Sequence, residues 1–391
     1  MQRSSSLFSV LAASLLLAGA CAQLRGGLGA DPAPVPTSVF RMPPANRGSE
    51  AYSAWFADAR GRMLYFGLSP FWQLWWRSGG DPLGDLAQPG DHLIGRFDLE
   101  RETFLAPLRV RDGGPDVRSS IWDVLVHSNG RIYYTTYFEE IGSVNPDGTD
   151  VRAFEGLGRG FNELYEGPSG NIYASRYSDA PARPERRRYG AIVEFTPQGR
   201  LVREIRFERD AEKFTAPKSI AVDPSSGEIW LNTDTFRADG SILYETLRLA
   251  PDGRVLMRQA APPELHFVRF DRQGVGYFAE SIDSHFRLRI TANGRELARL
   301  PLGPREPLDF IQDIHFAQTG EAVLAFWSGR VTLVRREGNR FRTTDLVFTR
   351  PAECAPPEGR SLLYSAVAYG GRVYATLSCG ATILSAAIPG P

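Results

Sequence analysis

Beyond residue 50, one pattern of apolar and polar positions recurs along the chain. Each copy has a short run of alternating or apolar residues, a tight turn that ends in Gly, and then β-branched or aromatic residues. This order is typical of two antiparallel strands joined in a hairpin. The copies are residues 51–67, 120–136, 160–176, 216–233, 264–280, 310–326 and 362–378. Their turn glycines recur at intervals of 69, 40, 57, 47, 46 and 51 residues, and such a period, widened by insertions, predicts a β-propeller.

A second turn follows most copies, so each copy supplies four strands, which make one blade. The last copy ends after about three strands, near the end of the chain. An apolar patch near 37–42 is the natural fourth strand, because a strand from the N-terminus would cover the open sheet edge. We therefore predict an all-β fold, a propeller of four-stranded blades whose ring is closed by this N-terminal strand. Seven blades are expected, with six or eight as alternatives, in a single domain over 49–391.

Composition and charge agree with such a fold and exclude some classes of binding partner. With 39 Gly and 28 Pro in 391 residues, the chain has too many turn formers for a helical bundle. Its 42% of apolar residues can bury a substantial core. Formal net charge is zero, from 45 basic and 45 acidic residues, with no long basic run. We therefore expect a monomer that does not bind nucleic acid.

The first 21 residues predict export rather than structure. An apolar stretch over 7–17 follows a short polar start and is too short to span a bilayer. The string Leu-Ala-Gly-Ala-Cys that ends at Cys21 resembles a bacterial lipobox, although its Ala-Gly-Ala also fits an ordinary cleavage site. The resemblance implies a lipid on Cys21 that holds the protein at the membrane, and Ala22 after it points to the outer membrane. The alternative is a secreted or soluble periplasmic protein.

Residues 22–48 are rich in Gly, Ala and Pro and predict a flexible tether that includes the closing strand. Once Cys21 is assigned to lipid, two of the three cysteines remain. We predict a disulfide between Cys354 and Cys379, as expected in an oxidising compartment. Two unrelated buried thiols are the alternative, because sequence separation does not establish geometry.

The default binding site of a propeller is the funnel lined by its innermost strands. Counting back from each tight turn gives one channel position per blade: Ser53, Trp122, Asn162, Lys218, His266, Gln312 and Leu363. We predict that Trp122, Asn162, Lys218 and Gln312 bind the ligand. Lys218 is one of two lysines in the chain and could hold a carboxylate or a phosphate.

The segment 161–179, FNELYEGPSGNIYASRYSD, resembles a phrase of the gluconolactonase, senescence-marker-protein and paraoxonase-like propellers. The repeat style is similar to that of streptogramin lyases and NHL-type propellers. In the lactonase-like families the Asn that matches Asn162 is a divalent-metal ligand. The other metal positions are not matched here, and a Lys at one of them opposes a cation. A rebuilt Ca²⁺ or Mg²⁺ site would use Asp123, Glu163 and Asp313 beside Asn162.

A second chemistry is general acid/base catalysis. His266, with Glu280 and His285 from the same blade, could form a proton-transfer group, and the streptogramin lyase resemblance favours a His at this strand start. Alternatively, His266 and Lys218 only fill a solvated channel. Three functions therefore compete. We favour a membrane-tethered propeller that binds a small molecule or a protein at its rim; the others are a metal-dependent lactonase-like or esterase-like hydrolase and a lyase that uses His266.

Overall fold

The computed structural model describes residues 34–43, 53–69, 91–112, 121–136, 140–176, 190–206, 214–236, 242–260, 263–305, 309–349, 351–352 and 363–389. All of them belong to one compact unit, Pro34–Pro391. Their regular structure is β-strand, and no helix among them is long and apolar enough to cross a membrane. The expected export signal and Cys21 lie outside the described residues.

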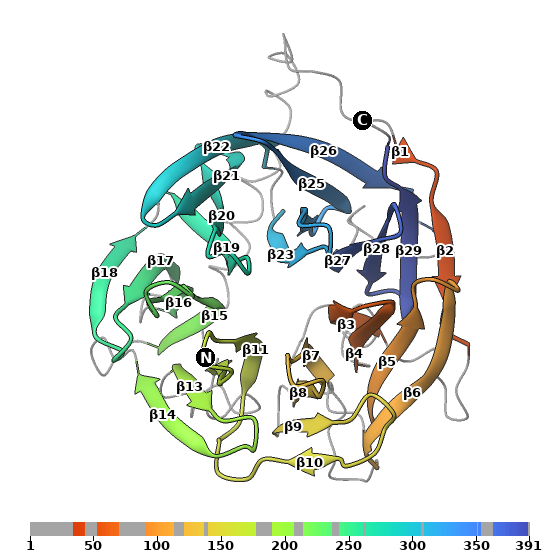
Figure 1. Ribbon diagram of the computed structural model, residues 1–391, viewed down its shortest axis with the longest axis horizontal. Helices are drawn as coiled ribbons and strands as arrows, with labels where there is room; N and C mark the ends of the chain where they lie inside the picture. Colours follow the sequence, from red (N-terminus) through yellow and green to blue (C-terminus); the bar gives the residue numbers. More distant parts are fainter. Residues whose placement is uncertain are drawn as a thin grey trace, which may run out of the picture. The chain divides into compact units, whose positions relative to one another are not determined.

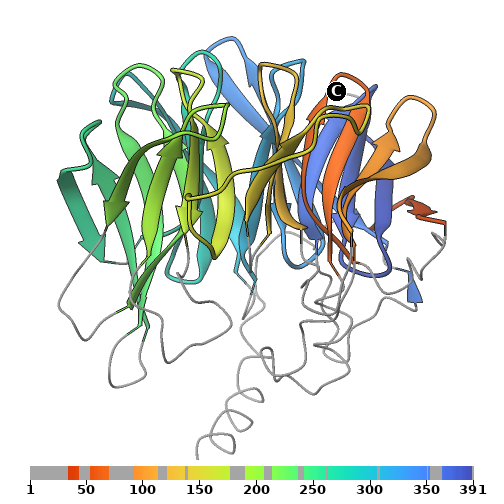
Figure 2. The same cartoon turned by 90° about the horizontal axis from the view of Figure 1, so that it is seen from below.

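The described strands form seven sheets around a central axis (Figure 1), which confirms the predicted seven-bladed propeller. The edge-on view shows the strands running along that axis (Figure 2). Within each blade, the strands that follow one another in the chain pair in antiparallel order. From the innermost strand outward, the blades are β3 (Ser53–Arg60), β4 (Met63–Ser69), β5 (His92–Asp98), β6 (Thr103–Arg111); β7 (Ile121–Val126), β8 (Ile132–Thr136), β9 (Ile141–Val144), β10 (Arg152–Ala153); β11 (Phe161–Glu166), β12 (Ile172–Arg176), β13 (Ala191–Phe195), β14 (Leu201–Arg206); β15 (Phe214–Val222), β16 (Ile229–Phe236), β17 (Ile242–Leu249), β18 (Val255–Ala260); β19 (Glu264–Phe270), β20 (Gly276–Ile282), β21 (His285–Ala292), β22 (Arg295–Pro304); β23 (Ile311–Phe316), β24 (Ala322–Phe326), β25 (Arg330–Glu337), β26 (Arg340–Phe348); and β27 (Leu363–Tyr369), β28 (Arg372–Leu377), β29 (Thr382–Ala387).

The seventh blade is completed from the N-terminus, as the sequence predicts. Strand β2 (Ser38–Arg41) pairs antiparallel with β29, placing Phe40 opposite Ile383. The ring of Phe40 then packs on Phe97 of the first blade, with 5.3 Å between ring centroids. Strand β1 (Pro34–Val35), which the sequence did not predict, pairs in parallel with β26 of the sixth blade. The N-terminal segment therefore runs beside both β26 and β29 (Figure 1).

The tight turns and the packing between blades explain why this repeat folds as it does. The seven predicted turn glycines all have positive φ, as at Gly130 with φ 89°, where an L-residue would be strained. Strands in the middle of a blade are covered on both faces by the neighbouring blades, so β8, β12 and β24 are buried at every residue. Leu288 of β21 and Leu324 of β24 belong to one such cluster between blades.

Candidate functional site

Every innermost strand is bulged near its start. In each of the seven, the inner strand carries one residue more than its partner: between Ala54 and Ala57, Ile121 and Asp123, Phe161 and Glu163, Pro217 and Ile220, Leu265 and Phe267, Ile311 and Asp313, and Leu363 and Ala366. A bulge breaks the two-residue alternation and re-aims a side chain. The residues between these pairs include Trp122, Asn162, His266 and Gln312, which are channel positions predicted from the sequence.

These bulges line a cavity of about 420 Å³ at the start of the inner strands, which we call the upper cavity. The four predicted ligand-binding residues all line it, as does His266: Trp122, Asn162, Lys218, Gln312. One channel prediction was displaced by a bulge. In the seventh blade Tyr364, rather than the buried Leu363, lines the cavity. In the first blade Trp55 and Phe56 line it.

One wall of the upper cavity is aromatic. Trp55 and Tyr364 are buried, with ring centroids 4.6 Å apart, and they form the back of the wall. Three partly exposed rings lie on this pair, from Phe56, Trp122 and Trp327. Trp122 lies 4.3 Å from Trp55 and Trp327 lies 5.5 Å from Tyr364, measured between centroids. Because buried rings support the exposed ones, this wall is a rigid apolar surface.

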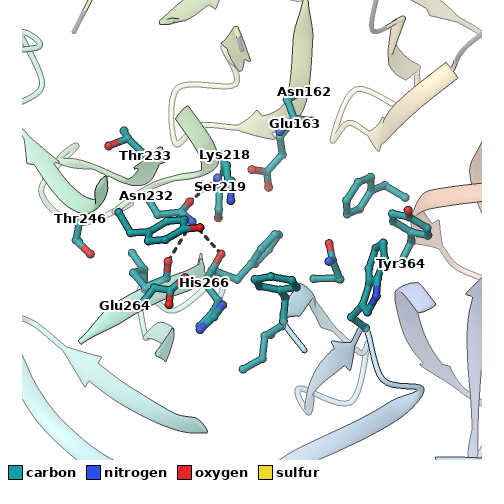
Figure 3. A pocket seen from close by; sticks show the side chains of 18 of the residues that line it. Asn162, Glu163, Lys218, Ser219, Asn232, Thr233, Thr246, Glu264, His266 and Tyr364 are labelled. Atoms are coloured by element: carbon teal, nitrogen blue, oxygen red, sulfur yellow. Dashed lines mark hydrogen bonds between the residues drawn. The ribbon is translucent and has the colours of Figure 1, made fainter. Parts of the chain in front are cut away.

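The opposite wall is polar and comes from the fourth and fifth blades. In Figure 3 the labelled polar side chains gather on one side, and Tyr364 lies with other rings across the cavity. The amide of Asn232 organises this wall. Its Oδ1 accepts the N–H of Ser219 at 2.7 Å, and its Nδ2 donates to the carbonyl oxygens of Leu265 at 3.0 Å and His266 at 3.2 Å. Asn232 thus joins the bulges that carry Lys218 and His266.

His266 is held in its neutral form. Burial, together with the positive charges of Arg305 and Lys218, lowers the pKa of its imidazole to about 3. Its Nε2 lies 2.9 Å from Oγ of Ser281, and its ring packs against Phe286 with 5.3 Å between centroids. A neutral imidazole with so low a pKa is a weak base at pH 7.

The structure does not bring the other two members of the expected proton-transfer group to His266. Both carboxylate oxygens of Glu280 bind arginines, at 3.0 Å to Arg287 and 2.7 Å to Arg289. His285 is exposed, and its Nδ1 lies 2.8 Å from the carbonyl oxygen of Asp283. Neither Glu280 nor His285 lines the upper cavity. Strand alternation explains this for Glu280, because its neighbour Ser281 takes the face toward His266.

The carboxylates expected to bind a metal connect adjacent blades instead. Asp123 accepts the N–H of Leu164 in the next blade at 2.7 Å, and Glu163 accepts that of Ile220 at 2.9 Å. Further bonds of this kind run from Val126 N–H to Asp58, from Val268 N–H to Ser219 and from Ala57 N–H to Ser365. Asp313 also bonds to the Ser365 side chain. We call this set the inter-blade ring.

A cation already occupies the centre of these carboxylates. The guanidinium of Arg269 pairs with Glu163, donates to the carbonyl of Ile220 at 3.0 Å and lies over the ring of Phe267. No group of three or more His, Cys, Asp or Glu among the described residues is placed to hold a metal ion. Arg269 lies among the predicted ligands Glu163 and Asp313 and would repel Ca²⁺ or Mg²⁺, which weighs against a metal there. The metal site of Asn162, Asp123, Glu163 and Asp313 stays a prediction.

A second cavity, of about 690 Å³, follows the inner strands toward their ends; we call it the lower cavity. The ion pairs of Arg269 with Glu163 and of His315 with Asp58 are part of its lining. His315 Nε2 lies 3.1 Å from Oδ1 of Asp58, joining the sixth blade to the first. Burial lowers the pKa of His315, but the hydrogen bond and charge of Asp58 outweigh this, so its pKa is raised. For the carboxyl of Glu163, burial has the opposite effect from that on His315 and raises its pKa to about 7, although the charge of Arg269 lowers it.

The cysteine predictions are only partly covered by the structure. Cys379 is disulfide-bonded. Cys21 and Cys354 both lie outside the described residues, so the pairing of Cys379 with Cys354 stays a prediction.

No protein-family model matches the chain, and no curated protein matches it. Many solved structures are similar to it in fold, and two of them are described next. One is a catalytically inactive virginiamycin B lyase from Staphylococcus aureus with quinupristin, with a TM-score of 0.55, 11% identity, and coverage of 90% of this chain and 100% of that chain. The other is the extracellular domain of a protein described as a hybrid two-component system from B. thetaiotaomicron, with a TM-score of 0.53 and 13% identity. The match covers 90% of this chain and 41% of that chain. The described residues thus form a seven-bladed β-propeller, and the predicted likeness to streptogramin lyase propellers is confirmed for the fold.

Proposed function

We propose that this protein is an exported propeller that binds a small organic ligand in the upper cavity. The observation that carries the proposal is the convergence of bulges. All seven inner strands are irregular at the same level, and their re-aimed side chains meet at one cavity of about 420 Å³. Known small-molecule sites have such volumes, a mainly apolar lining and a few placed polar groups. A partner protein at the same rim is the alternative occupant.

Binding can be tested with two tryptophan variants. Trp122→Phe trims the aromatic wall, whereas Trp230→Phe removes an indole that packs on Phe278 and does not line the cavity. A panel of small organic molecules is screened by the shift in melting temperature, and hits are measured by calorimetry. We expect Trp122→Phe to weaken every one-to-one ligand several-fold and Trp230→Phe to leave affinity unchanged. Equal affinities in both variants would show that the ligand binds elsewhere.

We propose further that the propeller is anchored to the outer membrane through a lipid on Cys21. The lipobox-like string supports this, as does the disulfide-bonded Cys379, since disulfides persist in oxidising compartments. A solved structure with a similar fold is an extracellular domain. Metabolic labelling with radioactive palmitate tests the anchor. Label on the wild type that is lost in Cys21→Ser supports it, and an unlabelled wild type points to the secreted alternative.

A lyase that uses His266 is the second candidate, favoured by the position of His266 in the upper cavity. Its low pKa and the absence of Glu280 and His285 from the lining weigh against it. If an elimination activity is found, His266→Ala must abolish it. The hydrolase alternative needs a metal, so a Ca²⁺ or Mg²⁺ titration should raise the melting temperature in the wild type and not in Asn162→Ala. No shift in the wild type would remove that alternative.

A further inference from the structure

The upper cavity has an amide side chain at each boundary between its two walls. The aromatic wall comes from the sixth, seventh, first and second blades, and the polar wall from the fourth and fifth. Around the ring (Figure 1), the third blade, which carries Asn162, lies between the two walls on one side. On the other side, the sixth blade contributes Gln312 as well as Trp327.

The charged side chains of the polar wall already have partners inside the protein. Glu264 pairs with Arg305 at 2.6 Å. Glu245 pairs with Arg258 at 2.9 Å. Lys218 also interacts with other groups of the protein. These charges are therefore held by the protein itself.

The same holds for the two carboxyl groups beside Asn162. Asp123 accepts the N–H of Leu164 at 2.7 Å, and Glu163 pairs with Arg269. Each charged side chain in the described lining thus has a partner. A charged ligand would lose its hydration here without meeting an unpaired opposite charge, which is unfavourable.

Some uncharged polar groups of the lining, by contrast, have no hydrogen-bond partner among the residues that the structure describes. They include the half-buried amides of Asn162 and Gln312. The hydroxyl of Thr233, which is only 1% exposed, is a third such group. Amides and hydroxyls both donate and accept hydrogen bonds. The groups still open to a ligand therefore suit an uncharged amide or hydroxyl.

Gln312 lies beside the aromatic wall. It stands in the bulge of β23 directly after Ile311. Ile311 pairs with Phe326, the residue before Trp327. The N–H of Trp327 also donates to the carbonyl oxygen of Phe310 at 2.9 Å. A flat ring stacked near Trp327 therefore has its edge close to the Gln312 amide.

Resting on the binding function proposed above, we propose that the upper cavity takes an uncharged aromatic compound that carries a carboxamide or hydroxyl group. Its ring system stacks on the aromatic wall, and its polar group bonds to Gln312. Because buried rings hold Phe56, Trp122 and Trp327 from behind, stacking orders few flexible side chains. The polar group of the ligand satisfies an amide that has no partner among the described residues.

The test uses three naphthalene probes of nearly the same shape and different charge. At neutral pH 2-naphthamide is uncharged, 2-naphthoate is an anion and 2-naphthamidine is a cation. Calorimetry should show that the wild type binds the amide at least about tenfold more tightly than either ion, because each ion is desolvated without an unpaired partner. An ion that binds as tightly as the amide would overturn the inference.

A matched pair of variants tests the polar contact. Gln312→Met removes the amide at nearly constant length, and Gln318→Met makes the same change at an exposed residue of the same blade. We expect Gln312→Met to weaken 2-naphthamide about three- to tenfold, as the loss of one neutral hydrogen bond does, and Gln318→Met to leave it unchanged. Equal affinities of Gln312→Met and the wild type would also overturn the inference. Should Gln312→Met not fold, the three probes on the wild type decide alone.

The outcomes separate this inference from the proposed binding function. If an ion binds best, and Trp122→Phe weakens it while Trp230→Phe does not, the cavity binds ligands of another class. If none of the three probes binds at millimolar concentration, the inference is overturned. The binding function fails only if the broader panel also gives no ligand whose affinity depends on Trp122.

Discussion

The two cavities of the channel are lined by the same inner strands but have opposite chemistry. The upper cavity holds His266, whose pKa is lowered to about 3, and the lower cavity holds His315, whose pKa is raised. His266 faces Arg305 and Lys218, whereas His315 faces Asp58. The inner strands thus line the upper cavity with residues of their bulges. The same strands carry side chains that accept backbone N–H groups of the following blade, as Asp123 does from Leu164.

The largest effect is expected at the centre of the inter-blade ring. Arg269→Met leaves Glu163 buried without its partner, which should lower the free energy of unfolding by about 3–5 kcal/mol at pH 8. Without Arg269, the pKa of Glu163 in the native state should rise further. The unfolded chain keeps the ordinary pKa of 4.5, so between these two values the native state of the variant binds a proton that the unfolded state does not. Proton binding therefore stabilises the variant as pH falls, and the loss of stability should shrink toward pH 5. Chemical denaturation at both pH values measures this; equal losses would contradict the assignment.

The next effect concerns the lower histidine. Asp58→Asn keeps an acceptor for Val126 N–H but removes the charge beside His315. We expect a loss of about 1.5–3 kcal/mol at pH 6. The pKa of His315 is higher in the native state than its value of 6.5 in the unfolded chain. The resulting stabilisation is complete below pH 6.5 and is lost as pH rises through the native-state pKa. The loss should therefore be smaller at pH 9, and His315→Asn should show the same trend.

For His266, the loss of stability on substitution should change with pH in the opposite direction to that at His315. His266→Asn removes a neutral contact to Ser281 and should cost about 0.5–1.5 kcal/mol at pH 8. In the wild type the native state resists protonation of His266, so its stability rises with pH between about 3 and 6.5. The cost of His266→Asn should thus decrease at pH 5. An NMR titration checks the cause directly: His266 should not titrate between pH 5 and 8, and titration near pH 6.5 would refute the low pKa.

The smallest effect is expected at His285, which belongs to neither cavity. His285→Ala should change the free energy of unfolding by less than about 0.5 kcal/mol and leave the affinity for any small-molecule hit of the binding screen unchanged. A clear loss of binding would mean that the rim beyond the upper cavity takes part in recognition.

The sequence predicted the architecture well because turns and strands are local. The seven hairpins, their positive-φ glycines and the closing strand at 38–41 all follow from spacing and composition. Five of the seven channel positions line the upper cavity. Leu363 was wrong, since counting along a regular strand cannot locate a bulge. A signal was present: apolar residues three apart, as in Ile121 and Val124, interrupt the two-residue alternation.

The aromatic wall was missed for a different reason. Trp327 follows the end of β24, and it meets Tyr364 only when the sixth and seventh blades pack together. The roles of the carboxylates were missed likewise, because Asp123 and Glu163 find their partners in the backbone of the following blade. No local sequence pattern predicts the ion pair of Arg269, because its partner Glu163 lies 106 positions away in the chain.

By itself, the sequence determined the repeat length and the hairpin turns, since both depend on residues near one another in the chain. It also indicated the closing strand, because the last blade lacks one strand and an apolar segment near the N-terminus can supply it. Only the tertiary structure decided which side chains the blades present to the channel. Bulges re-aim single side chains, and bonds between blades determine which of those side chains already have partners. The division between the upper cavity and the inter-blade ring therefore exists only in the folded propeller.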